Sequence, residues 1–476
     1  MAYNFKRCDR DQMYLLPPDM RDWLPENHFV WFIMEIVSQL DLSAFYRRYN
    51  PEGDGRPAYH PSMMTALYFY SYCTGERSSR KIERLCMESV PFRIISGDQQ
   101  PDHTTISRFR KKFSRELSTL FLQVLTLCYE SGLCNFRTVS VDGTKIQANA
   151  SMASNRNESG LKKEIQKYFR EADEADARED KLYGPDRRGD ELPPELSTEE
   201  KRIRKIKEIQ ERLRAEKEEK VRSQEKKIED RKAQEESTGK KKRGRKPKSV
   251  EAVEEEASEN LKASITDPDS RLMKNAKGHL QGYNAQATAS EDQIILSAEI
   301  TQECNDKQQL IPMLEKTKEN LDAVDSNIEI GTLLADAGYF SRKNLESIKT
   351  DDPDLLVAVC KEWKTRKGQK DGKEITLPLT PVSAMENKLL TPRGKELYKK
   401  RSITIEPIFG HIKEVLRFGR FMRRGLEACD SEWKMVCTAH NLLKLWRYGI
   451  DKVHEKIREN RAIVPAETLE ITALAA

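Results

Sequence analysis

The spacing of apolar residues predicts helices over the first part of the chain. In the segments 27–40 (NHFVWFIMEIVSQL) and 61–75 (PSMMTALYFYSYCTG), apolar side chains recur at the three- and four-residue intervals of a helix. Shorter helices follow at 78–89 and 102–113, and a longer one comes after them. We therefore expect residues 1–136 to form a helical N-terminal domain.

The helix predicted at 102–113 (DHTTISRFRKKF) begins at Asp102, a residue type that caps helices, and carries several basic side chains. A helix, a turn and a basic helix favour a helix-turn-helix DNA reader. A helical bundle with a solvated basic face fits the same pattern equally well. In the first interpretation, the DNA contacts on this helix are Arg108, Arg110 and Lys111.

The hydrophobic period changes at residue 137. The segment RTVSVDGTKIQANAS (137–151) alternates between apolar and polar residues, which predicts a β-strand with Asp142 near its end. After a long charged segment, further strands and helices are predicted, and together they indicate an α/β fold with a mixed sheet. The strands are expected at 279–290, 293–302, 330–335 and 353–359, the helices at 305–321, 341–350 and 402–460, and loops at 361–395.

The charged segment, residues 154–262, is dominated by Glu, Lys and Arg. Many opposite charges within 197–236 are four residues apart, which supports a solvent-exposed helix, while the apolar residues are too sparse for a coiled-coil seam. We interpret the segment as an inserted charged helix or hairpin with disordered flanks. The remaining domain limits are then 137–153 for the first core strand, 263–460 for the rest of the core and 461–476 for a flexible tail.

A basic run, GKKKRGRKPKS (239–249), lies inside the insertion. Arg243 and Arg245 are separated by one glycine and followed by Lys-Pro, as in an AT-hook, whose arginines enter a narrow minor groove of DNA. A solvated basic linker is the alternative interpretation.

Composition narrows the class of protein. Charged residues make up 34% of the chain, but the net charge is only +5, so a nucleic-acid surface has to come from local clusters of basic residues. The absence of a run of about 18 apolar residues predicts no membrane span, and the N-terminus lacks the apolar stretch of a signal peptide. The nine cysteines form no CxxC pair, which favours free thiols in a reducing cytoplasm.

Three acidic residues are candidates for chemistry. Asp142 and Asp336 each end an apolar strand and are followed closely by glycine, in VSVDG and LLADAG. Acids at strand ends lie at the rim of a sheet, where the chain opens into a crevice. Glu406 begins a predicted helix, because Pro407 suits a first turn, and Lys413 lies seven residues further on the same face.

Three carboxylates in one crevice are costly unless divalent cations neutralise them. Mg²⁺ binds few carboxylates and completes its shell with substrate oxygens, and two such ions promote phosphodiester cleavage. Taken singly, an aspartate before glycine is usually a turn residue and a helix glutamate is usually solvated. Asp267 is the rival second ligand, although Asp267 and Asp269 fit a turn better, and His411 fits a packed or solvated position better than a DNA contact.

The sequence resembles the DDE transposases of bacterial insertion sequences over nearly its whole length. Three segments carry the resemblance: VSVDGTKIQANAS, LLADAGYFS and the Tyr-Arg-Glu-Lys segment 398–413. The resemblance implies a ribonuclease H-like core after a helical domain, with Asp142, Asp336 and Glu406 as catalytic metal ligands. It also implies that Tyr398, Arg401 and Lys413 lie near the transposon-end DNA. Four residues separate Arg401 from Glu406, one more than in the strictest form of this segment, and a proline follows Glu406.

The implied activity is metal-dependent cleavage at the element ends, followed by attack of the freed 3′-hydroxyl on target DNA. The implied cofactor is Mg²⁺, with Mn²⁺ as a substitute, and the partners are the terminal inverted repeats, the target DNA and at least one further copy of the chain. Such a protein works in the cytoplasm, at the nucleoid. Two other functions stay open: a non-catalytic DNA-binding regulator or inactivated relic, and another ribonuclease H-like nuclease acting on RNA or DNA junctions.

Overall fold

The computed structural model describes residues 19–49, 57–150, 155–157, 160–161, 199–239, 246–275, 278–359 and 380–463. The chain divides into two compact units, Met1–Phe113 and Ser114–Ala476. The division falls before the long helix α7 (Ser114–Glu130), which packs on helices of the second unit. No helix in the described part of the chain is both long enough and apolar enough to cross a membrane.

The first unit is helical, as the apolar spacing predicts. Helix α3 forms its centre, because nearly all of its side chains are buried, and Phe45, Phe109 and Phe113 pack against one another beside it. Asp102 caps the basic helix by accepting a hydrogen bond from the backbone N–H of Thr105 at 2.8 Å. The elements are η1 (Met20–Trp23), α1 (Phe29–Gln39), α2 (Ser43–Tyr46), α3 (Pro61–Cys73), α4 (Ser79–Glu88), α5 (Val90–Ser96) and α6 (His103–Lys112).

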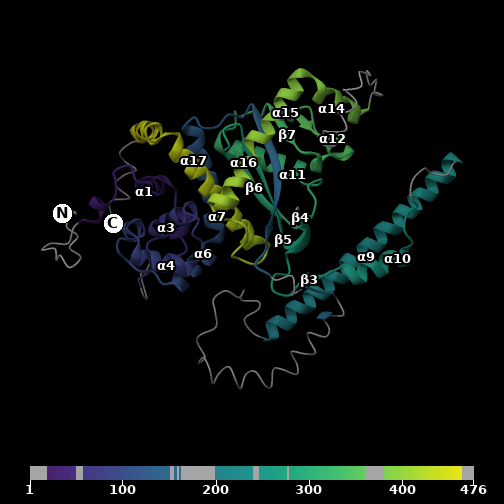
Figure 1. Ribbon diagram of the computed structural model, residues 1–476, viewed down its shortest axis with the longest axis horizontal. Coiled ribbons are helices and arrows are strands. Elements are labelled where there is room, and N and C mark those ends of the chain that lie inside the picture. Colours follow the sequence, from purple (N-terminus) through teal and green to yellow (C-terminus); the bar gives the residue numbers. More distant parts are fainter. Residues whose placement is uncertain are drawn as a thin grey trace, which may run out of the picture. The chain divides into compact units, whose positions relative to one another are not determined.

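The second unit is built on a mixed six-stranded sheet (Figure 1). Its order is β4-β5-β1-β7-β8, and β6 also pairs with β5. β1 is antiparallel to β5 and parallel to β7, so the sheet changes from antiparallel to parallel at β1. The strands are β1 (Thr138–Gln147), β4 (Arg271–Asn275), β5 (Gly278–Ser290), β6 (Ile295–Thr301), β7 (Thr332–Ala335) and β8 (Asp354–Val357), with a separate pair β2 (Asn155–Arg156) and β3 (Ala263–Ser264). The predicted mixed α/β fold is confirmed.

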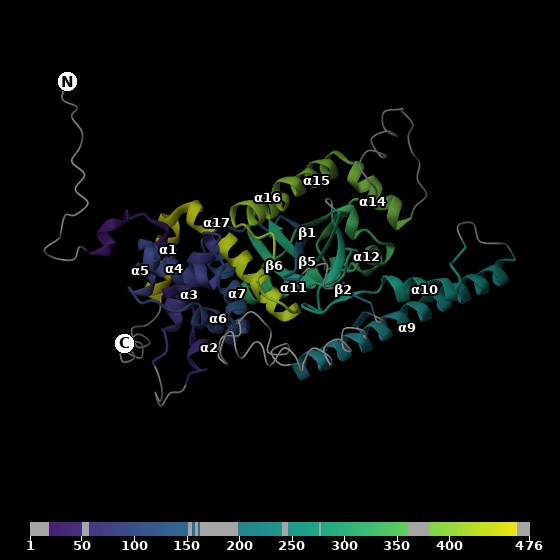
Figure 2. The same ribbon diagram turned by 60° about the horizontal axis from the view of Figure 1, so that its bottom comes forward.

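Helices cover both faces of this sheet. On one face, Thr317 of α11 bonds to Thr288 and Ser297 of the sheet at 2.8 and 2.9 Å. On the other face, Ser140 of β1 bonds to Thr404 of α15 at 2.6 Å, and Figure 2 shows α14, α15 and α16 following one another along the sheet. The helices are α11 (Leu310–Val324), η4 (Ala337–Tyr339), α12 (Arg342–Ser347), α14 (Pro381–Leu390), α15 (Pro392–Thr404), α16 (Glu406–Gly410), the π-helix η5 (His411–Val415) and α17 (Leu426–Ile463).

Three expectations from the sequence need correction. Asp142 lies in the middle of β1, because the strand continues to Gln147 in its pairing with β5. The stretch 361–395 is not all loop: α14 and the start of α15 lie within it, and each begins at a proline after a threonine cap. The predicted helical region 402–460 is interrupted between η5 and α17.

The insertion contains a helical hairpin of α9 (Glu199–Thr238) and α10 (Val250–Asn260). The two helices are tied by the ion pair of Lys217 and Glu254 at 2.9 Å. The apolar residues that look sparse in the sequence gather at the base of α9, where Ile206, Ile209 and Leu213 pack in a small buried cluster. Arg243 and Arg245 lie outside the described residues.

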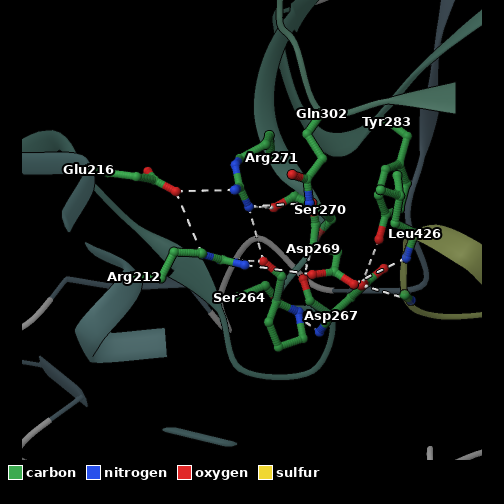
Figure 3. Close-up of polar contacts among 12 residues, drawn as sticks. Arg212, Glu216, Ser264, Asp267, Asp269, Ser270, Arg271, Tyr283, Gln302 and Leu426 are labelled. Carbon is green, nitrogen blue, oxygen red and sulfur yellow. Dashed lines mark hydrogen bonds and ion pairs between the residues drawn. The ribbon is translucent and has the colours of Figure 1, made fainter. Parts of the chain in front are cut away.

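Charged side chains join the base of α9 to the segment between β3 and β4 (Figure 3). Arg212 lies 3.6 Å from Asp269, and Glu216 lies 3.1 Å from Arg271. Asp269 also accepts a hydrogen bond of 3.1 Å from the backbone N–H of Leu426, at the start of α17. These contacts attach the N-terminal half of α9 to the segment that leads into β4 of the sheet.

Candidate active site

The sheet brings Asp142 and Asp336 next to each other. Val141 of β1 is paired with Ala335 of β7 in the parallel ladder, so the two aspartates come next on neighbouring strands. Neighbouring strands lie about 4.8 Å apart, which sets the separation of the two backbones. Asp336 also caps η4 by accepting a hydrogen bond of 2.8 Å from the N–H of Gly338.

Arg401 connects Asp142 with Glu406. From α15, its guanidinium donates to Oδ2 of Asp142 at 3.3 Å and to Oε1 of Glu406, the first residue of α16, at 2.7 Å. The Asp142 side chain is 19% exposed, whereas that of Glu406 is 48% exposed. The guanidinium of Arg401 therefore lies between two carboxylates, and that of Asp142 is less exposed than that of Glu406.

The other two residues of the Tyr-Arg-Glu-Lys segment contact the same two strands. The Tyr398 hydroxyl donates to the carbonyl oxygen of Ala335 at 3.3 Å, next to Asp336. The Lys413 ammonium donates to the hydroxyl of Thr144, two residues after Asp142. Tyr398, Arg401 and Lys413 thus attach the segment to β1 and β7, and Arg401 connects Glu406 to Asp142.

Electrostatics favour a cation in this region. Burial raises the pKa of Asp142 to about 6, and the charges of Asp336 and Asp306 act in the same direction. The N–H of Gly143 and the guanidinium of Arg401 oppose the rise. Burial lowers the pKa of Arg401, but nearby negative charge outweighs this effect and raises it overall. Asp142 therefore carries its charge at neutral pH at an energetic cost that a bound cation would remove.

Several residues at the site were missed by the sequence reasoning. Asp306 lies between β6 and α11, and its Oδ1 accepts hydrogen bonds from Asn284 at 2.7 Å, Gln286 at 2.8 Å and Lys145 at 3.3 Å. One signal was available: polar residues alternate along β5, at Asn284, Gln286 and Thr288. Asn284, Gln286 and Thr288 are all fully buried. Buried polar side chains at strand spacing require partners, and here the partner of two of them is Asp306.

The carboxylates of Asp142, Asp336 and Glu406 are ligands of the type that divalent metal ions prefer. A guanidinium already stands as a cation between Asp142 and Glu406. A Cβ added at Gly143 would lie 2.9 Å from Oδ1 of Asp306, and one added at Gly338 would lie 2.9 Å from Oδ1 of Asp336. In this conformation, no three His, Cys, Asp or Glu side chains of the described residues are close enough together to hold a metal.

Asp267, the rival ligand, has other partners. It is fully buried, and its Oδ1 accepts hydrogen bonds from the Tyr283 hydroxyl at 2.8 Å and from the N–H of Gly425 at 3.1 Å. Figure 3 shows Tyr283 pointing toward this carboxylate. His411 is packed: its Nδ1 lies 3.0 Å from Nδ1 of His440 on α17. Both residues therefore make structural contacts.

The candidate DNA contacts of the first unit differ in exposure. Arg108 and Lys111 are exposed on α6. Arg110 is partly buried and donates to the hydroxyl of Tyr72 at 3.5 Å and to the carbonyl of Arg77 at 3.3 Å. Arg108 and Lys111 are thus presented to solvent, while Arg110 bonds within its own unit.

Two models of known protein families match the chain. A transposase domain model (DUF772) matches residues 18–112, and a transposase DDE domain model matches residues 248–442. The two models span more than half of the chain between them, and the second includes Asp306, Asp336 and Glu406. A DDE domain implies a ribonuclease H-like fold, which agrees with the mixed sheet. No curated protein and no solved structure matches the chain.

Proposed function

We propose that this chain, which belongs to the DDE transposases of insertion sequences, cuts DNA at the ends of its element and joins the freed 3′-hydroxyl to target DNA. One observation carries the proposal. Asp142 and Asp336 follow paired positions on neighbouring parallel strands, and Arg401 links Asp142 to Glu406. Two carboxylates from segments far apart in sequence are thus neighbours on the sheet, and Arg401 connects a third to them.

Asp142, Asp336 and Glu406 would hold the divalent ions, Mg²⁺ or Mn²⁺, which supply Lewis acidity to the attacking oxygen and to the scissile phosphate. The chain's own side chains orient the DNA. Arg401 offers a planar fork of donors that matches phosphate oxygens, and Lys413 adds a point charge on the same approach. Tyr398 holds α15 against β7 through the Ala335 carbonyl. The attacking group is water or a DNA hydroxyl, so the chemistry needs no protein nucleophile.

The remaining partners follow from the same function. Arg108, Arg110 and Lys111 of the first unit, and Arg243 and Arg245 of the basic run in the insertion, would bind the terminal inverted repeats and flanking DNA. Bringing two element ends together requires two or more copies of the chain. The place of action is then the DNA of the nucleoid, in the cytoplasm.

The test is cleavage of a labelled duplex that carries an element end, read from the DNA flanking the coding region. Wild type should cut at the end in Mg²⁺ or Mn²⁺, and Asp336→Asn should bind the duplex without cutting it. Asp322→Asn makes the same chemical change at an exposed position on α11 and should cut like wild type.

Three results would contradict the proposal. Equal cutting by wild type and Asp336→Asn would mean that Asp336 holds no essential ion. Tight binding without cutting in either metal would favour a non-catalytic DNA-binding protein, and preference for hybrid or junction substrates would favour another ribonuclease H-like nuclease.

A further inference from the structure

We propose that Asp306 is a positioning residue of this active site, and that its charge strengthens the binding of divalent cations at Asp142 and Asp336. This inference rests on the proposed function, because it assumes that those two aspartates hold the ions. It assigns a role to a fourth carboxylate, which lies at the start of the segment leading into α11.

Asp306 is held in one orientation by a polar network. Asn284 and Gln286, fully buried on β5, donate to its Oδ1 at 2.7 and 2.8 Å, and Lys145 of β1 donates at 3.3 Å. Gln286 in turn accepts a hydrogen bond from the hydroxyl of Tyr339, in the turn that follows Asp336. The network therefore joins Asp306 to the strand that bears Asp142 and to the turn that bears Asp336.

Two glycines allow the Asp306 carboxylate to approach. A Cβ at Gly338 would lie 2.9 Å from Oδ1 of Asp336 and 3.5 Å from Oδ2 of Asp306, so both carboxylates border the same small space. A Cβ at Gly143 would lie 2.9 Å from Oδ1 of Asp306 and would collide with the Gln286 amide at 2.1 Å. A side chain at Gly143 would displace Gln286 and Asp306, and one at Gly338 would displace Asp336 next to Asp306.

Asp306 acts from the face of β1 opposite to Asp142. Ser140 and Asp142 point toward α15, whereas Gly143 and Lys145 point toward the α11 face, where Asp306 lies. Three donors bond to Oδ1 of Asp306 and fix the orientation of its carboxylate. Asp306 can therefore add negative charge to the site from the α11 face of the sheet. Its hydrogen bonds run to Asn284, Gln286 and Lys145, so its charge would act on a bound cation through space.

The charges around the site leave an excess of negative charge. Asp142, Asp336, Glu406 and Asp306 bring four carboxylates, against the three cations Arg401, Lys145 and Lys413, the last of which bonds to Thr144. The Lys145 and Asp306 side chains are only 15% and 22% exposed, so their charges are less screened than those of a surface pair. Asp306 should therefore attract a cation to the site, and Lys145 should moderate that attraction.

Because Asp306 and Lys145 carry opposite charges, substitutions at the two positions should change cation binding in opposite directions. Full-length protein is titrated with Mn²⁺, and free Mn²⁺ is followed by its electron paramagnetic resonance signal. Asp306→Asn should weaken binding about tenfold, because it removes the charge but keeps the shape of the side chain. Lys145→Met should tighten binding roughly tenfold, because Asp306 then keeps an unopposed charge. Asp322→Asn, the exposed control on α11, should bind like wild type.

A purely structural role for Asp306 gives a different result. Both substitutions remove the Lys145–Asp306 ion pair, so a structural role for that pair predicts that both weaken Mn²⁺ binding. Weaker binding by Lys145→Met, or unchanged binding by Asp306→Asn, would overturn the inference. Asp336→Asn tests the proposed function separately: if it alone abolishes binding, only the role of Asp306 is wrong. Wild-type affinity in Asp336→Asn would overturn the metal site and the inference with it.

Discussion

Arg401 of α15 donates a hydrogen bond of 3.3 Å to Asp142 of β1, across a sequence separation of 259 residues. The same guanidinium reaches Glu406 at 2.7 Å. In this conformation the arginine offsets part of the charge of two of the carboxylates that are proposed to bind metal, and it connects them to each other. A bound ion and this ion pair therefore compete for the same oxygens.

Replacing Arg401 should separate metal binding from catalysis. Arg401→Met removes the competing cation, so Mn²⁺ affinity should rise about tenfold. Cleavage of the element-end duplex should nevertheless fall, because the phosphate-binding fork is lost. The measurements are a Mn²⁺ titration and a cleavage assay at saturating metal, with Arg393→Met, an exposed position of α15, as the matched control. Unchanged Mn²⁺ affinity in Arg401→Met would show that the arginine does not compete with the ion.

The stability of the metal-free protein should depend on the ionisation of Asp142. Its pKa is raised from 3.8 to about 6 in the folded state, so folding favours the protonated form. Stability should then fall as the pH rises from about 4 to about 6 and stay level above, by about 3 kcal/mol in all. Asp142→Asn should lack this contribution and should be the more stable of the two at pH 7.5. Denaturant titrations at pH 4.5 and pH 7.5 measure the difference, and a wild type that gained stability relative to the variant over this range would contradict it.

Gly143 should be intolerant of a side chain, whereas Gly410 should accept one. A Cβ at Gly143 would stand 2.1 Å from the amide nitrogen of Gln286, while one at Gly410, in α16, would meet nothing within 4 Å. We expect Gly143→Ala to cost about 1–3 kcal/mol of stability and to weaken Mn²⁺ binding. Gly410→Ala should be neutral or stabilising by up to about 1 kcal/mol, because alanine favours helix. Thermal unfolding compares the two, and equal midpoints would argue against close packing at Gly143.

Asp267 should matter for stability rather than for cleavage. Asp267→Asn retains an oxygen that can accept from Tyr283 and from the Gly425 N–H, so metal-dependent cutting should persist. Asp267→Ala leaves two buried donors without an acceptor and should lower stability by about 1–3 kcal/mol. Loss of cutting in a folded Asp267→Asn protein would make Asp267, and not Asp336, the second ligand.

The sequence predicts the fold class and most elements because the hydrophobic period changes clearly at residue 137 and is strong in β5, β6 and β7. It also selects Asp336 by its place directly after a strand, which the structure confirms for β7. The sequence places Asp142 near the end of a strand, whereas it lies in the middle of β1. The local pattern cannot show that β1 continues to Gln147, because this continuation depends on pairing with β5. The catalytic roles of both residues stay predictions.

Asp306 could not be found from its own neighbourhood. The segment around it, NDKQQL, has the composition of a loop before a helix, and nothing in it indicates a site. Its partners Lys145 and Asn284 come from two strands whose pairing is a property of the whole sheet. The core at the base of α9 was missed for a related reason, because Ile206 and Leu213 pack with residues outside the charged helix.

The wide separation of Asp142 from Arg401 along the chain has a consequence during synthesis. The ribosome makes β1 early, but β7 follows only after the whole insertion, and α15 and α16 come later still. Because domains fold as units during translation, a nascent chain cannot assemble the four carboxylates until nearly all of it has emerged. A prematurely terminated product that ends before α15 would retain the helical first unit but would lack Arg401 and Glu406, and with them the proposed catalytic site.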